Sequence, residues 1–308
     1  MEIESSGMLI IDKPAGISSA KVVALLKEKA GLHKVGHTGT LDPFATGVLI
    51  CCVNQATRLA RFFLNGNKKY QGTLLLGIET DTLDMTGKVI ATCDQFDFPE
   101  EHLHSVFRRF VGEMDQVPPV YSALKHNGVR LYKLARKGRP VQKSARRIMI
   151  SSLEILQIDL PKIDFQVACS AGTYIRTLCA DIGRELGCGS HLQGLRRIES
   201  CGVTIDQSIT LEEMEMLASQ GRLKDNLICM SDAISAMKGM VADDVILKKI
   251  FYGQPIMDSD LTGKWIESEI KDRFNGFIKI VDIKNNLLAV MDTQKKDGLY
   301  DYCCVFHP

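Results

Sequence analysis

The sequence predicts a globular fold that mixes α-helices and β-strands. Hydrophobic residues make up 45% and charged residues 24% of the chain, as in proteins with a buried core. Short apolar runs bounded by turn signals alternate with segments of helical periodicity. The 308 residues are enough for two domains. No apolar run approaches the ~18 residues of a membrane span, and the acidic N-terminus lacks the regions of a signal peptide, so we expect a cytoplasmic protein.

Strands and helices alternate closely in the first 80 residues. Ser18 or Ser19 is a typical N-cap for a helix, and Gly31 is a typical residue to end it. The other elements that we expect in this part are strands at 8–11, 48–53 and 70–76, and a short helix that Thr57 caps and Asn65-Gly66 ends.

The remaining chain continues this alternation. Pro161 separates two predicted strands, at 148–160 and 163–169, which we expect to pair with each other. Thr210 and Glu213 form the capping box of a helix that ends near Gly221. Further predicted elements are helices at 99–111, 173–186 and 243–252, a connector at 230–240, and strands at 277–283, 287–291 and 302–306.

The stretch 36–49 shows the strongest functional signal. It contains three glycines, three threonines, His37 and the Asp42-Pro43 step, directly before an apolar strand. Glycine permits backbone conformations that other residues avoid, and Pro43 biases Asp42 toward an extended conformation. We therefore expect Asp42 on a stiff loop beside a buried strand, which suits a catalytic carboxylate. The simpler alternative is that Asp42 caps a turn through its own backbone.

The ten cysteines indicate neither a disulfide framework nor a metal site. They are scattered, two pairs are adjacent in sequence, and several lie in apolar runs, as buried thiols of a reduced protein do. Cys188 and His191 have no second pair to complete a zinc site. Asp81 and Asp84 lack the spacing of a calcium-binding loop. We expect no metal.

The net charge of +1 does not by itself suggest a nucleic-acid partner, but the charge distribution does. No acidic residue occurs from residue 116 to residue 149. A segment of this kind attracts phosphates, although a solvated basic face is the alternative. Its basic residues are Lys125, Arg130, Lys133, Arg136, Lys137, Arg139, Lys143, Arg146 and Arg147.

Several motifs in a fixed order resemble those of TruB-type tRNA pseudouridine synthases. The stretch 36–49 resembles the motif that contains the catalytic Asp of this family. The other matching stretches are 12–19, Lys69-Tyr70, 118–125, 172–178 and Leu195-Arg196-Arg197. Together they extend over about residues 7–203, which makes a chance match very unlikely.

The resemblance implies an α+β fold with a mixed, largely antiparallel central sheet and flanking helices. It implies a catalytic domain at 1–235, with a basic RNA-binding insertion at about 113–147, and a small β-rich domain of the PUA type at 241–308. The likeness of the second domain is weak. Its eleven acidic and nine basic side chains indicate a mainly structural role.

The resemblance also assigns roles to individual residues. Asp42 is the catalytic carboxylate, and Arg176 pairs with it and keeps it ionised. His37 fills the space that the flipped base leaves, and Tyr70 stacks on the uracil. Further expected roles are pocket walls for Tyr174 and Leu195, support of the tyrosine loop for Lys13 and Pro14, and RNA-backbone contacts for Lys125, Arg130, Lys133, Arg136, Lys137 and Arg139.

The implied substrate is the uridine at position 55 in the T-loop of tRNA. The reaction breaks the C1′–N1 bond and reattaches the base through C5, so no oxidation occurs and we expect no cofactor. The carboxylate acts either as nucleophile or as base, and the sequence favours neither. We expect a monomer that needs no protein partner.

Two other functions remain open. The first is a box H/ACA-type synthase that works on a guide RNA, against which the arm at 118–139 argues. The second is a tRNA-binding or chaperone module without catalysis, against which Asp42, Tyr70 and Arg176 together argue.

Overall fold

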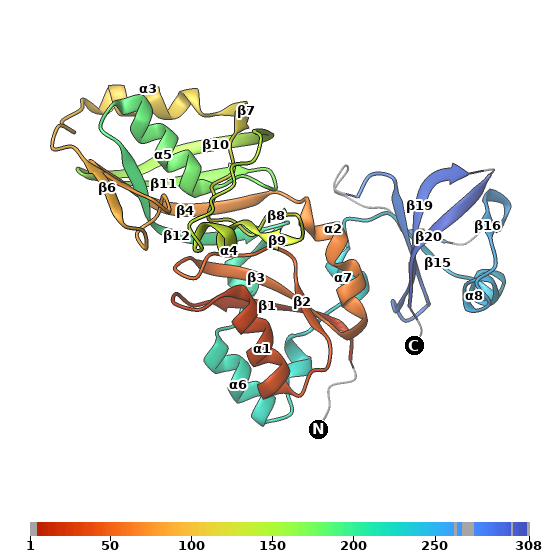
Figure 1. Cartoon of the computed structure of the whole chain (residues 1–308). Helices are drawn as coiled ribbons and strands as arrows, with labels where there is room; N and C mark the ends of the chain where they lie inside the picture. The colour runs from red at the N-terminus through yellow and green to blue at the C-terminus, as the bar shows by residue number, and fades with distance from the viewer. Residues whose placement is uncertain (1–4, 262–263, 267–273, 297, 307–308) are drawn as a thin grey trace.

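The computed structural model describes residues 5–261, 264–266, 274–296 and 298–306. In these residues a sheet of ten strands forms the main body, and a sheet of six strands forms the C-terminal part (Figure 1). The strands of the large sheet are β1 (Gly7–Lys13), β2 (Val35–His37), β3 (Thr46–Val53), β4 (Lys68–Leu76), β7 (Gly112–Gln116), β10 (Arg146–Asp159), β11 (Lys162–Cys169), β12 (Ser190–Ser200), β13 (Val203–Thr204) and β14 (Ile228–Cys229).

The large sheet has the order β14-β1-β3-β12-β4-β11-β10-β7, with β2 beside β3 and β13 beside β12. Its strand pairs are antiparallel except β3 with β12, which is parallel. The predicted α+β fold with a mixed, largely antiparallel sheet is therefore confirmed.

The large sheet has two halves, and the helices that pack on each half form a separate hydrophobic core with it. Helices α1 (Ser19–Ala30) and α6 (Leu211–Ser219) pack their apolar sides on β1 and β3. Helices α3 (Glu100–Arg109) and α5 (Ile175–Leu186) pack on β4, β10 and β11. The N-cap at Ser18 and the left-handed Gly31 end α1 as predicted.

The two halves meet at the junction of β3 and β12, which we call the seam. The pairing there is short, with Arg196 beside Thr46 and Arg197 beside Gly47. Gly47 has a φ of 102°, and a Cβ at this position would lie 2.2 Å from the carbonyl oxygen of Arg197. Only glycine allows the strands to approach this closely. Strand β12 was not among the predicted elements, although it connects the halves.

Other boundaries also differ from the predictions. The helix expected to start at Thr57 begins earlier, as η1 (Asn54–Ala60), and continues as α2 (Arg61–Leu64); the Thr57 hydroxyl donates to the carbonyl of Asn54 and caps nothing. Helix α5 begins two residues after Thr173. The remaining small elements are β5 (Ile78–Thr80), β6 (Val89–Thr92), η2 (Ile205–Gln207), η3 (Leu223–Asn226) and α7 (Met230–Ala233).

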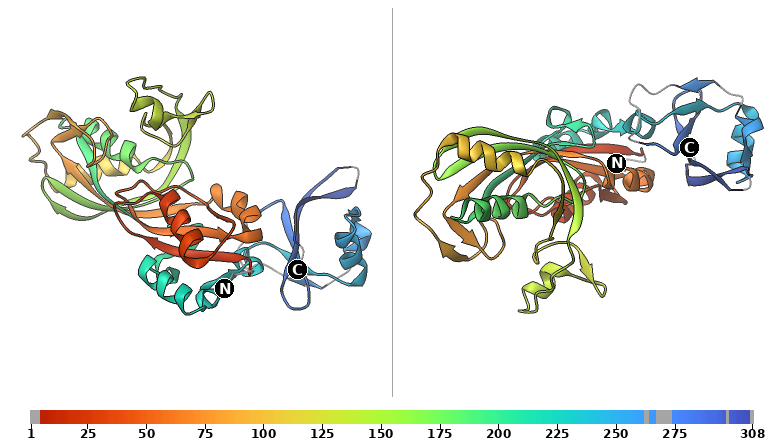
Figure 2. Two further views of the ribbon diagram at one scale, coloured as in Figure 1. Left: turned by 60° about the horizontal axis from the view of Figure 1, so that its bottom comes forward. Right: turned by 90° about the horizontal axis from the view of Figure 1, so that it is seen from above.

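The basic segment forms an arm that leaves one face of the large sheet (Figure 2). It consists of a hairpin, β8 (Lys125–His126) with β9 (Val129–Arg130), and of helix α4 (Leu131–Ala135). The short helical turn expected within an irregular arm is thus present. Leu131 and Ala135 of α4 are buried.

The C-terminal sheet shares a hydrophobic core with the main body. Its order is β16-β20-β19-β18-β15-β17. The ring centroids of Phe62 and Phe277 lie 5.2 Å apart, and those of Phe63 and Phe274 lie 6.3 Å apart. The elements of this part are β15 (Gly239–Val241), α8 (Asp244–Phe251), β16 (Ile256–Met257), η4 (Asp258–Asp260), β17 (Trp265–Ile266), β18 (Phe277–Val281), β19 (Leu287–Lys296) and β20 (Leu299–Val305). None of the helices in the described ranges is long and apolar enough to cross a membrane.

Candidate active site

The loop of Asp42 is held in place by the segment that follows β1. The buried Ser19 hydroxyl donates to the carbonyl of Leu41 (3.1 Å) and accepts from its amide (2.9 Å). The amide of Gly16 donates to the carbonyl of Pro43 at 2.8 Å. These bonds confirm the predicted stiff loop, and they explain why the stretch 12–19 accompanies the stretch 36–49.

Lys13 supports this same loop. Its side chain is fully buried, and its ammonium group donates to the carbonyls of Pro14 (2.7 Å), Ile17 (2.8 Å) and Pro43 (3.2 Å). Burial lowers the pKa of Lys13 to about 8, and the nearby Asp42 opposes this shift. Lys13 and Pro14 were expected to support the tyrosine loop. The bonds of the Lys13 ammonium lead to the aspartate loop, and support of the tyrosine loop stays a prediction.

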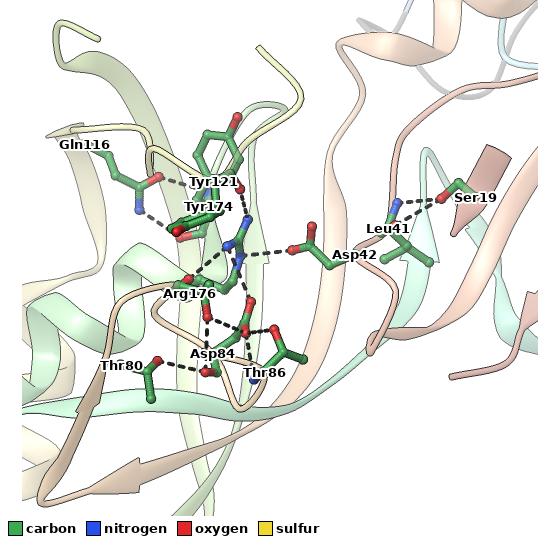
Figure 3. Close-up of polar contacts among 11 residues, drawn as sticks. Ser19, Leu41, Asp42, Thr80, Asp84, Thr86, Gln116, Tyr121, Tyr174 and Arg176 are labelled. Carbon is green, nitrogen blue, oxygen red and sulfur yellow. Dashed lines mark hydrogen bonds and ion pairs between the residues drawn. The ribbon is translucent and has the colours of Figure 1, made fainter. Parts of the chain in front are cut away.

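Arg176 faces Asp42 from the other half of the sheet (Figure 3). Its side chain is 4% exposed, and its Nε lies 2.9 Å from Oδ2 of Asp42. The same guanidinium donates to the carbonyl of Thr82 at 2.9 Å and to that of Tyr121, in the arm, at 2.8 Å. The predicted Arg176–Asp42 pair is confirmed, and it also ties the site to the root of the arm.

Asp84 is a second carboxylate on Arg176. Its Oδ2 lies 3.4 Å from Nη1 of Arg176. Its Oδ1 accepts hydrogen bonds from the Thr82 hydroxyl (2.8 Å), the Thr86 hydroxyl (2.6 Å) and the Thr86 amide (2.9 Å). Asp84 is thus held from one side and orients Arg176 from the other. The described residues contain no cluster of His, Cys, Asp or Glu side chains that could hold a metal ion.

Opposing effects act on the Asp42 carboxylate. Burial in the site raises its pKa, the charge of Arg176 lowers it, and the charge of Asp84 raises it again. The net direction is upward from the ordinary value. Arg176 was expected to keep Asp42 ionised. It works in that direction, but desolvation outweighs it. The side chain of Asp42 keeps 36% of its exposure, so it remains open to a substrate.

Tyr70 lies deep in the site beside Arg197. The two residues are paired across β4 and β12, so their side chains are on the same face of the sheet. Burial raises the pKa of Tyr70, while the charge of Arg197 and its hydrogen bond lower it. Tyr70 is 8% exposed and Arg197 is 2% exposed.

His37, on β2, is half-buried near the entrance. Its Nδ1 accepts from the amide of Gly39 at 3.4 Å. Burial lowers the pKa of His37, and the charges of Arg197 and of Arg130 in the arm lower it further. A charge of the arm thus acts on this end of the Asp42 loop.

Tyr174 and Leu195 lie at the edges of the site. Tyr174 is the N-cap of α5; the Gln116 side chain accepts from its amide at 2.8 Å and donates to its carbonyl at 3.0 Å. The Arg146 guanidinium lies 4.6 Å from the centre of its ring. Leu195 is half-buried on β12, opposite Gly72.

The arm presents the predicted cations to solvent. Because the segment contains no acidic residue, their charges are not compensated locally. The exposed side chains are those of Lys125, Arg130, Lys133, Arg136, Lys137 and Arg139. The sequence assigned no role in the site to Asp84, Gln116 or Arg197, although Arg197 lies in a matching stretch, and it assigned Ser19 only a helix cap. No local pattern identifies them, because their partners lie in distant segments.

Comparisons with known proteins agree with this arrangement. The family described as TruB family pseudouridylate synthase (N terminal domain) matches residues 27–175, and the tRNA pseudouridylate synthase B C-terminal domain matches residues 176–237. The tRNA pseudouridine synthase B of Syntrophotalea carbinolica is 44% identical over 81% of this chain and 81% of its own. The protein of the same name from Syntrophobacter fumaroxidans is 42% identical over 94% of both chains.

Solved structures give the same result. A Cbf5-Nop10-Gar1 complex contains a chain that superposes with a TM-score of 0.75 at 27% identity, over 98% of this chain and 85% of that one. An H/ACA RNP bound to a substrate RNA gives a TM-score of 0.73 at 25% identity, over 98% of this chain and 85% of that one. The residue ranges that match these two families contain Asp42, Tyr70, Arg176 and Leu195. The chain therefore belongs to the TruB family of pseudouridylate synthases, and it is an isomerase.

Proposed function

We propose that this enzyme converts the uridine at position 55 in the T-loop of tRNA to pseudouridine, with Asp42 in the chemical step and without a cofactor. The observation that supports this most directly is the Asp42–Arg176 ion pair, which is buried on the arginine side and open on the aspartate side. The relatives at 42–44% identity are named for tRNA.

The arm provides the binding surface in this proposal. Its exposed cations attract the phosphates of a T-arm and do not read sequence. The target uridine must leave its stack, which costs a few kcal/mol. His37, half-buried at the entrance, would take the space left in the RNA. Tyr70 would stack on the uracil, a contact worth roughly 1–3 kcal/mol per base.

The chemistry follows from the position of one carboxylate. Asp42 either attacks as a nucleophile or removes a proton from the sugar, and both routes require its ionised form. Arg176 favours that form and directs it, because its planar guanidinium also binds the Thr82 carbonyl and Asp84. The C1′–N1 bond breaks, a C1′–C5 bond forms, C5 loses a proton and N1 gains one. Atoms and charges therefore balance without an external reactant.

A second function, modification directed by a guide RNA, is favoured by the structural match to H/ACA complexes. The higher identity to relatives named tRNA pseudouridine synthase B favours the first. The purified chain with a T-arm hairpin transcript that contains [5-³H]uridine separates them. We expect tritium release from the hairpin without any added RNA, and none from the Asp42→Asn variant. Release only with a guide RNA would contradict the proposal, and binding without release would indicate a chaperone.

A further inference from the structure

Arg197 crosses the seam between the two halves of the sheet. Its Nε donates to the carbonyl of Val48 on β3 at 2.7 Å. Its Nη2 donates to the carbonyl of Gly39, in the Asp42 loop, at 3.1 Å. On β12 it is the direct neighbour of Tyr70 on β4. Arg197 therefore joins β3 and the Asp42 loop to the strand beside Tyr70, at the short pairing between β3 and β12.

Burial makes this guanidinium costly. The side chain of Arg197 is 2% exposed, and within the described part of the chain no carboxylate lies within ion-pair distance of it. A buried charge without a counter-charge costs free energy that two carbonyl bonds offset only in part. A neutral side chain would fill a purely structural role at lower cost. An unpaired cation in a reaction site is suited to a negative charge that develops during the reaction.

We propose that Arg197 is a positioning residue that holds the Tyr70 phenol across the seam and stabilises its phenolate when Tyr70 accepts the C5 proton of the substrate. In this step the phenolate takes the proton and becomes a phenol, the C5 electron pair restores the aromatic ring, and N1 takes a proton from water. The phenol then loses its proton to water before the next turnover. The inference rests on the proposed function.

The charges around Tyr70 agree with this role. Arg197 faces the phenol from β12, Cys169 faces it from β11, and Asp42 faces it from the loop before β3. Cys169 and Asp42 disfavour a phenolate, as burial does, and Arg197 favours it. Arg197 is also among the charges that act on Lys13 and His37. Removal of its charge should therefore raise the pKa of Tyr70.

Matched substitutions on neighbouring residues of β12 test the proposal. Arg197→Gln removes the charge and Arg197→Lys keeps it without the planar fork. Arg196→Gln is the control, because Arg196 points to the other face and pairs with Asp12 at 2.7 Å. Single-turnover rates on the T-arm hairpin are measured from about pH 6 to pH 9.5, together with hairpin affinity and Tm.

We expect Arg197→Gln to slow the chemical step at neutral pH by at least ~100-fold and to move the rise of the rate to higher pH. Arg197→Lys should shift this pH dependence less than Arg197→Gln does. Arg196→Gln should stay within about twofold of the parent. A lower rate with an unmoved pH curve, or equal curves for Gln and Lys, would overturn the proposal and leave Arg197 a structural residue.

If neither Arg197 variant folds, the pH dependence is measured instead on the parent chain with 3-fluorotyrosine incorporated at position 70. Its more acidic phenol should move the rate curve to lower pH, and an unmoved curve overturns the proposal. Failure of the proposed function is recognised separately, because the parent chain itself would then release no tritium from the hairpin.

Discussion

The Nε of Arg176 lies 2.9 Å from Oδ2 of Asp42, although the two residues come from opposite halves of the large sheet. Asp42 belongs to the loop before β3, and Arg176 belongs to the first turn of α5. The reaction site is therefore assembled across the seam. Its geometry therefore depends on the groups that fix each half.

Asp42→Asn should abolish pseudouridine formation in single-turnover assays with enzyme in excess, because an amide is neither a base nor an effective nucleophile. Affinity for tRNA should stay near normal or rise slightly, since one negative charge near the phosphates is gone. If the rate stays within about tenfold of the parent, roughly 1.4 kcal/mol of barrier, Asp42 is a structural turn residue.

The same variant makes a prediction about stability. Because the folded state raises the pKa of Asp42 above its unfolded value, ionisation of this group costs stability once the pH exceeds the ordinary carboxyl range. Asp42→Asn should therefore have an equal or higher Tm at pH 7. The advantage should vanish at acidic pH, where Asp42 is protonated in both states. A lower Tm at neutral pH would contradict the upward direction of the shift.

Asp84→Asn should slow catalysis by about 10- to 100-fold while hairpin affinity changes little, because Arg176 loses its second carboxylate and aims less well at Asp42. Asp81→Asn is the matched control on the same loop. The Asp81 carboxylate accepts from the amide of Lys88 at 2.8 Å, a bond that an Asn side chain can keep. Equal rates for both variants would mean that Asp84 only shapes the loop.

Ser19→Ala should reduce the single-turnover rate by about tenfold or more, since the Leu41 amide and carbonyl lose their partner and Asp42 loses its fixed position. The adjacent Ser18→Ala is the control. Ser18 caps α1, so its removal should cost about 1 kcal/mol of stability without a comparable loss of rate. Guanidinium unfolding curves and single-turnover kinetics give the two quantities separately. Equal kinetic losses would show that any damage to α1 reaches the site.

Neutralisation of Lys133, Arg136, Lys137 and Arg139 should weaken binding to all tRNAs alike. The slope of log affinity against log salt should become shallower by up to ~0.7–0.9 for each phosphate that the arm no longer binds. The control neutralises four exposed lysines outside the arm: Lys21, Lys27, Lys29 and Lys224. An unchanged slope for the arm variant would identify the arm as a solvated face.

Local signals in the sequence predicted much of the fold. Ser18 and Gly31 ended α1 as expected, since caps depend on neighbours along the chain. Strand β12 was missed because Gly194 and the charged Arg196, Arg197 and Glu199 interrupt any apolar alternation. The strand conformation of β12 depends on pairing with β3 and β4, and a single sequence does not show which strands will pair.

For the candidate site, the sequence predicted the central pair of residues but not the residues that hold this pair in place. The resemblance supplied Asp42 and its partner Arg176, and the geometry confirms that pair. The residues that hold the pair depend on long-range contacts: Ser19 reaches Leu41, and Asp84 reaches Arg176. Such contacts between buried polar groups leave no periodicity, so sequence patterns could not reveal them. The bond from Lys13 to the carbonyl of Pro43 is a contact of the same long-range kind.

The seam also has a consequence for how the chain is made. Arg197 donates to Gly39 across 158 positions of sequence, and the bonds that fix the catalytic loop from the far half of the sheet thus come late in synthesis. While the chain emerges from the ribosome, β1 and β2 can pair with β3 at once, but the Thr46–Gly47 end of β3 has no strand partner on the β12 side until β12 arrives. Contacts of such long range slow folding. The end of β3 beside the catalytic loop therefore gains its last strand partner only after residues 196 and 197 have been made.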